Sequence, residues 1–147
     1  MNPTANPWLL AAGAGSLAAS AAHVACILGG ADWYRFLGAV NRMAAAVERG
    51  AMLPNVITAS IAGVLLVWAL IAFSAAGLIV RLPLLRIALV LISAVLLLRA
   101  AGIFVPSLWL PEHTPTFRAV SSAAVLALSA CFAIGTFAAW PSLSTRS

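Results

Sequence analysis

The chain has 147 residues, of which 64% are hydrophobic and 7% are charged. A soluble domain carries roughly 25% charged residues, so a chain this poor in charge could not cover its surface in water. The composition therefore excludes a soluble globular protein and predicts an integral membrane protein. The net charge of +5 comes from eight arginines and no lysine against three acidic residues. These arginines mostly flank apolar runs, where arginine sets topology and contacts anionic lipid headgroups. The sequence contains no basic run with interleaved aromatic residues, so we do not expect a nucleic-acid partner.

Four apolar segments are long enough to cross a bilayer, whose core of about 30 Å needs about 20 residues of helix. They cover residues 8–30, 54–78, 83–105 and 118–140. Prolines mark their ends, where proline costs a helix least. These prolines are Pro7, Pro54, Pro83, Pro106 and Pro141. The tryptophans agree, because Trp8 and Trp140 fall at one membrane face and Trp33 and Trp109 at the other, as in an aromatic belt. The sequence predicts one all-α domain, a four-transmembrane-helix bundle.

The first segment has an alternative interpretation as a cleaved signal peptide, because "SLAASAAH" offers small residues at a suitable spacing. A signal peptide has a positively charged start, and no arginine precedes this segment. We therefore expect it to be the first membrane crossing.

The stretch "WYRFLGAVNRMAAAVERG", residues 33–49 and the following Gly50, differs from the apolar segments around it. At 100° per residue its apolar side chains share one arc, and Arg35, Arg42 and Arg49 lie on the opposite side. Asp32 lies where a helix would be capped, and Gly50 where one would stop. The pattern predicts an amphipathic helix in the membrane interface. Its arginines would contact lipid headgroups, with Trp33 and Tyr34 as anchors; a sharper interpretation is that this helix covers a polar pocket.

Polar residues gather at the membrane face of this surface helix. They are His23, Cys26, Asn55, Thr58, Arg99, Ser121, Ser122, Glu112 and His113. Arg99 is the most informative, because a charge inside a membrane costs about 2.5–3.5 kcal/mol and needs a partner. It is expected either to snorkel, or to pair with Glu48, Glu112 or the hydroxyls of Ser121 and Ser122. The alternative is an anion or headgroup site that Arg99 forms with His23 and Asn55.

No cofactor, metal site or catalytic set is predicted. A lone histidine such as His23 more often forms a hydrogen bond between helices than it serves as a metal ligand. Haem would need a second histidine inside the membrane as its other axial ligand. Cys26 and Cys131 lie in apolar segments as small packing residues, with no C-x-x-C motif. The chain contains no intramembrane acid pair, no catalytic triad and no glycine-rich phosphate loop. We therefore expect a protein that is not an enzyme.

Ala12, Ser16 and Ser20 form a ridge of small residues on the first segment, which lets another helix approach closely. A homo-oligomer or a partner membrane subunit would cover such a ridge. This favours an accessory or structural membrane subunit. The cluster around Arg99 favours the alternative, a small transporter or a lipid- or anion-binding protein.

Three segments resemble small four-helix bacterial membrane proteins of the DoxX-like families. They are "AAHVACILGGADWYRFLGA", "LPLLRIALVLISAVLLLRAAG" with its late Arg99, and "FRAVSSAAVLALSACFAIG". The resemblance implies a four-helix bundle in a bacterial inner membrane with both termini in the cytoplasm. It implies no activity, cofactor or substrate.

Overall fold

The computed structural model describes residues 5–39, 41–105, 113 and 115–144. These residues form helices only, with no strand among them. The helices are α1 (Pro7–Phe36), α2 (Asn41–Glu48), α3 (Leu53–Ala75), α4 (Leu85–Ala101), the short 3-10 helix η1 (Gly102–Phe104) and α5 (Pro115–Ser144). Within this part of the chain, α1, α3, α4 continued by η1, and α5 are long and apolar enough to cross a membrane. The prediction of an all-α fold with four membrane-crossing helices is confirmed.

Local signals explain where the long helices begin and end. Asn6 caps α1, since its Oδ1 accepts hydrogen bonds from the backbone N–H groups of Trp8 and Leu9 at 3.0 and 3.2 Å. The helix kinks at Gly30, where the first crossing was predicted to end, and then continues to Phe36. The last helix α5 passes Pro141, its predicted end, and stops at Ser144.

The predicted surface helix over residues 33–49 is not one continuous helix. Its first residues belong to α1, and α2 begins at Asn41. Gly38 separates them with a φ of 87°, a conformation that favours glycine. The N–H of Ala39 donates to the carbonyl of Tyr34 at 2.8 Å and that of Gly38 to the carbonyl of Arg35 at 3.1 Å, which together form a Schellman motif. The stop expected at Gly50 is correct, since it follows α2 with a φ of 78°.

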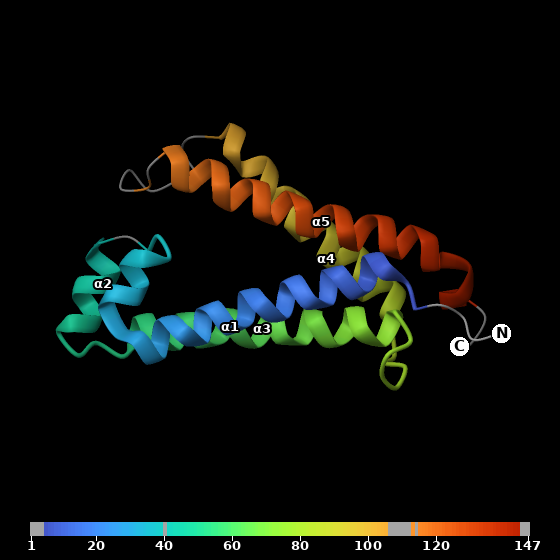
Figure 1. Cartoon of the computed structure of the whole chain (residues 1–147), viewed down its shortest axis with the longest axis horizontal. Helices are drawn as coiled ribbons and strands as arrows, with labels where there is room; N and C mark the ends of the chain where they lie inside the picture. The colour runs from blue at the N-terminus through green and yellow to red at the C-terminus, as the bar shows by residue number, and fades with distance from the viewer. Residues whose placement is uncertain (1–4, 40, 106–112, 114, 145–147) are drawn as a thin grey trace.

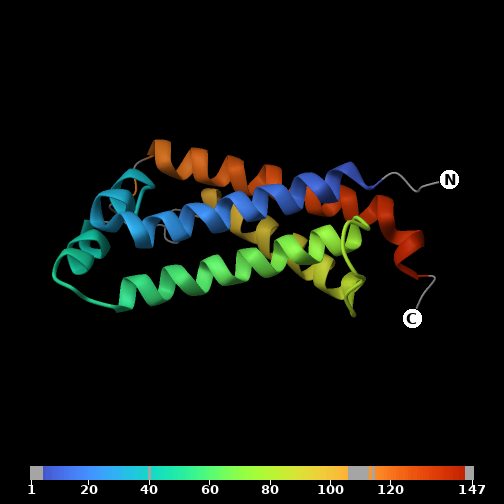
Figure 2. The same cartoon turned by 60° about the horizontal axis from the view of Figure 1, so that its bottom comes forward.

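The short helix α2 lies across the ends of α1 and α3 (Figures 1 and 2). Arg35 is in α1 and Arg42 is in α2, so the arginines spaced by seven do not share one helix. A position of α2 at the membrane surface stays a prediction.

The long helices form two pairs that meet at one end of the bundle. Helix α1 packs along α3, and α4 packs along α5, while α1 and α5 make the main contact between the pairs. Figure 1 shows the pairs close together where α1 begins and α5 ends, and apart at the end where α2 lies. The angle between the pairs therefore opens toward α2.

Two separate clusters of buried side chains match this arrangement. The larger cluster takes residues from all four long helices. Its members are Leu9, Ala12, Ala72, Ala76, Leu89, Ile92, Leu96, Phe132 and Ala139. The smaller cluster, near α2, consists of Cys26, Tyr34 and Ala44. The large core thus joins the pairs near the start of α1, and a different cluster holds α1 to α2.

The ridge of small residues on α1 is covered inside the chain. Ala12 and Ser16 are fully buried and Ser20 is 6% exposed. The Ser20 hydroxyl donates to the carbonyl of Ala62 in α3 at 2.8 Å. The ridge therefore serves the contact between α1 and its own neighbours, and it no longer argues for a second subunit.

Candidate functional site

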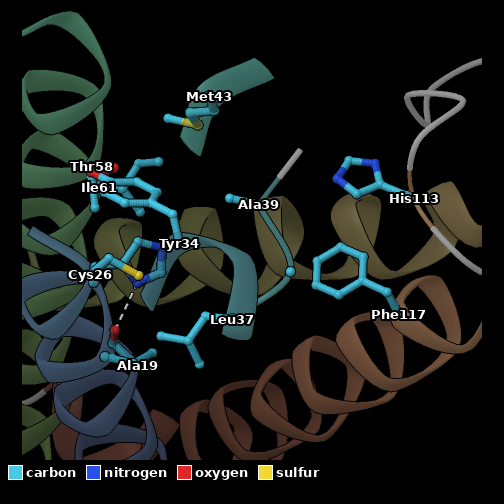
Figure 3. A pocket seen from close by; sticks show the side chains of 13 residues that line it. Ala19, Cys26, Tyr34, Leu37, Ala39, Met43, Thr58, Ile61, His113 and Phe117 are labelled. Carbon is cyan, nitrogen blue, oxygen red and sulfur yellow. Dashed lines mark hydrogen bonds between the residues drawn. The ribbon is translucent and has the colours of Figure 1, made fainter. Parts of the chain in front are cut away.

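A cavity of about 380 Å³ lies at the α2 end of the molecule, between the α1–α2–α3 end and the start of α5. Most of its wall is apolar. The apolar part comes from Ala19, Ala22, Leu37, Ala39, Met43, Ile61 and Phe117. Figure 3 shows Tyr34, Thr58 and Cys26 on one side, His113 and Phe117 on the other, and Leu37 and Ala39 between them. The cavity is thus placed where the two helix pairs share no core.

Tyr34 fixes one wall of the cavity. It is 2% exposed, and its Oη lies 3.0 Å from Asn55 Oδ1 and 2.9 Å from Thr58 Oγ1. A phenol has one proton. When that proton goes to the amide oxygen, the Thr58 hydroxyl donates to the phenol oxygen in return. Tyr34 was predicted as an anchor in the membrane interface, and this was wrong: its side chain is buried in the protein and ties α1 to α3.

His23 lies on the same wall, one helical turn after Ala19. Its Nδ1 is 2.8 Å from the carbonyl oxygen of Ala19. A carbonyl only accepts, so Nδ1 carries a proton and donates it. In the neutral ring the lone pair is then on Nε2, at the far end of the imidazole from its own helix.

His113 approaches from the opposite wall, just before α5. Its ring stacks on Phe117 with centroids 5.0 Å apart and an interplanar angle of 17°. The chain contains two histidines, and both line this cavity. Sequence reasoning placed His23 and His113 at the same membrane face but did not assign them to one cavity. The signal that could have found it is Gly38, which turns the chain back against Phe117: a Cβ at Gly38 would overlap the Phe117 ring.

The predicted pairing of Arg99 with a hydroxyl of the last helix is confirmed, whereas the alternative site that joins Arg99 to His23 and Asn55 is not assembled. Arg99 lies on α4 and its Nη2 is 3.4 Å from Ser121 Oγ of α5. Neither residue lines the cavity that contains His23. Asn55 instead accepts from Tyr34. The reason is the divergence of the two helix pairs at the α2 end (Figure 1), which separates the end of α4 and the start of α5 from α1 and α3.

The remaining members of the predicted cluster around Arg99 are found elsewhere. Ser122 is 4% exposed and borders a second, apolar space of about 340 Å³ between α4 and α5. Glu48 binds Arg35, as described next. Glu112 lies outside the described residues, as do Trp109, Pro106 and Val40.

An ion-pair network holds α2 to the end of α1. Arg35 donates from Nη2 to Glu48 Oε1 at 2.7 Å and from Nη1 to Asp32 Oδ1 at 3.2 Å. Arg35 was predicted to face headgroups, and these contacts show that it bridges two helices of its own chain. Arg42 and Arg49 lie exposed on and after α2, and Trp33 is 46% exposed with its ring edge-on to Phe36. Headgroup contact by these three residues stays a prediction.

The opposite end of the bundle has its own arginine contacts. Arg81, in the connection from α3 to α4, donates to the carbonyl of Ser142 at 2.6 Å. Asn6 Nδ2 donates to the carbonyl of Gly135 at 2.9 Å. Asn6, Arg81 and Ser142 border a space of about 590 Å³ at the start of α1 and the end of α5. Both contacts fix the connections at the end where the two helix pairs meet.

Among the described residues, no group of three or more His, Cys, Asp or Glu side chains could hold a metal ion. Cys26 and Cys131 are free thiols, and the Cys26 Sγ lies 3.9 Å from the carbonyl oxygen of Trp33.

Comparison of this chain with protein families, with curated proteins and with solved structures finds no match. The resemblance to DoxX-like families therefore stays a prediction, and the chemistry of the site rests on its own geometry.

Proposed function

We propose that this protein is a small, non-catalytic membrane protein that binds an amphipathic lipid in the cavity between its helix pairs. One observation carries the proposal: a largely apolar cavity of about 380 Å³ lies between two helix pairs that share a core only at their other end. Its volume is within the range of about 300–1,000 Å³ typical of small-molecule sites. Because apolar walls give water few hydrogen-bond partners, a membrane lipid is the natural occupant.

Two other functions have less support. An accessory or structural subunit was suggested by the ridge of Ala12, Ser16 and Ser20, and α3 already covers that ridge. An anion site at Arg99 would need His23 or Asn55. Asn55 instead accepts a hydrogen bond from Tyr34, and His23 lines a cavity that Arg99 does not line. The experiment described below distinguishes a homo-oligomer or a partner subunit from a bound lipid.

We further propose a bacterial inner membrane as the location, with both termini in the cytoplasm. Four crossings place both ends of the chain on one side, and α1 begins where α5 ends (Figure 1). In that orientation α2 and its arginines are on the periplasmic side, where Arg42 and Arg49 contact anionic headgroups. The test is a reporter enzyme that functions only in the periplasm, fused after Ser147. Activity of this fusion would show that the C-terminus is periplasmic and would contradict the proposed orientation.

The experiment fills the cavity with a side chain. Ala22 lines the cavity, so Ala22→Leu takes up part of its volume. Ala59→Leu, on the exposed surface of α3, is the matched control. Native mass spectrometry after gentle extraction is expected to show a bound lipid on the wild type and on Ala59→Leu, and none or little on Ala22→Leu. Equal lipid on all three proteins, or a stoichiometric foreign protein in place of lipid, would overturn the proposal.

A further inference from the structure

The polar atoms around the cavity are mostly engaged within the chain. The Tyr34 phenol and the Thr58 hydroxyl bind each other, and the phenol also binds Asn55. The Nδ1–H group of His23 donates to the carbonyl of Ala19. On the wall formed by α1 and α3, this leaves the Nε2 atom of His23 as an acceptor for a ligand. A ligand that meets it must offer a proton donor.

The charge of the lining side chains further restricts the class of ligand. Among the described residues that line the cavity, none is Arg, Asp or Glu. A ligand with a fixed charge would therefore meet no fixed countercharge, and an unpaired charge in an apolar space is costly. A ligand that carries its own transferable proton avoids this cost.

We propose that the lipid in this cavity is a single-chain carboxylic acid whose head binds His23; this rests on the lipid-binding function proposed above. The acid brings its proton with it, because desolvation in a membrane favours the neutral carboxyl form. In the cavity the proton moves from the carboxyl oxygen to Nε2 of His23. An O–H bond breaks and an N–H bond forms, and the result is a carboxylate beside an imidazolium with no net charge.

The contact of His23 with Ala19 supports both states of the ring. The Nδ1–H group donates to the carbonyl in the neutral ring, and it donates more strongly when the ring is charged. The ring can therefore accept the proton without giving up its own hydrogen bond.

This chemistry predicts different affinities for lipids that have the same alkyl chain but different head groups. A carboxylic acid gives a charge-assisted hydrogen bond, whereas an alcohol gives a neutral one and an ester offers no donor. A phosphodiester has a charge but no transferable proton. A cavity of about 380 Å³ also suits one chain better than a two-chain phospholipid.

The test compares lauric acid, dodecanol and methyl laurate, which are matched in chain length, by titration calorimetry with the full-length protein in detergent at neutral pH. Lauric acid is expected to bind wild type about ten- to a hundredfold more tightly than methyl laurate, with dodecanol between them. In His23→Gln this preference is expected to fall to about threefold or less. Arg49→Gln, an exposed position after α2 that does not line the cavity, is the control and keeps the preference. Nitrogen NMR of the wild type should show an imidazolium signal for His23 with lauric acid and not with the ester.

The outcomes separate this inference from the function on which it rests. Equal binding of the acid and the ester to wild type, or a preference that survives in His23→Gln, overturns the carboxylic-acid ligand while lipid binding stands. Absence of binding by all three lipids overturns both. The wild-type series and its NMR signal need no variant, so they decide the question even where His23→Gln does not fold.

Discussion

Arg86 contacts Trp140 in two ways: its guanidinium carbon lies 4.7 Å from the centroid of the indole ring, and its Nη2 donates to the Trp140 carbonyl at 3.1 Å. The first contact is a cation–π interaction, and the second binds a carbonyl near the negative end of α5. Together they attach the start of α4 to the end of α5, where the two helix pairs meet.

Replacing Arg86 with Met is expected to lower the free energy of unfolding by about 1–2 kcal/mol, because both contacts are lost. Arg86→Lys should lose less, since it keeps the charge but not the planar group. The measurement is denaturant unfolding of the purified protein in detergent micelles. Arg49→Met removes an exposed arginine after α2 and is the control, expected to stay within about 0.5 kcal/mol of wild type. Equal losses for Arg86→Met and Arg49→Met would contradict the assignment.

The phenol of Tyr34 should couple energetically to Thr58. Tyr34→Phe is expected to cost about 1 kcal/mol, because it leaves the buried Thr58 hydroxyl and the Asn55 amide without this partner. Thr58→Val alone should cost a similar amount. The double variant should cost less than the sum by about 0.5–1 kcal/mol, as measured by a double-mutant cycle. Simple additivity would show that the two side chains do not depend on each other.

Gly38 and Gly50 allow a matched test of the turn beside the cavity. Both have a positive φ, so Ala at either position is strained by about 1–2 kcal/mol. The space around Gly50 is open, whereas a Cβ at Gly38 would overlap Phe117. Gly38→Ala should therefore destabilise the protein more than Gly50→Ala, by about 1 kcal/mol in thermal unfolding. The excess should disappear when Phe117→Ala is added, and an unchanged excess would refute the contact.

Two helical glycines should respond in opposite directions. Gly13 is buried on α1, and a Cβ there would press on the ring of Phe73 in α3. Gly63 of α3 faces open space. Gly63→Ala is expected to stabilise by up to about 1 kcal/mol through helix propensity, and Gly13→Ala to destabilise by about 1–3 kcal/mol through overpacking. Denaturant unfolding of the two variants checks this. A stabilising Gly13→Ala would show that α1 and α3 are less closely packed than described.

Much of the helical architecture was predictable because length, apolarity and proline each mark a membrane crossing. The prediction failed between residues 33 and 49, because arginines spaced by seven residues suit a helix whether or not it is broken between them. Gly38 was a readable stop signal, since its place after Phe36 suits a left-handed residue at a helix end. The burial of Tyr34 and its hydrogen bonds to α3 show that the chain packs inward there.

The site was less predictable, for a geometric reason. Membrane depth can be read from the sequence, and it placed Arg99, His23 and Asn55 at one end. Which helices diverge at that end depends on side-chain packing. The pairing of α1 with α3 and of α4 with α5 separates Arg99 from His23, and it brings His113 to the cavity instead.

The pairing has a consequence for how the protein is made. Each pair consists of consecutive crossings, so each is a helical hairpin whose internal contacts are local in the chain. Local contacts form early, and a nascent chain folds from its N-terminus. The hairpin of α1 and α3 is complete once Ala75 has been synthesised, before the second hairpin is complete. Joining the two hairpins through α1 and α5 is then a separate, later step in the membrane, and a chain truncated after α3 should still insert and hold its first hairpin.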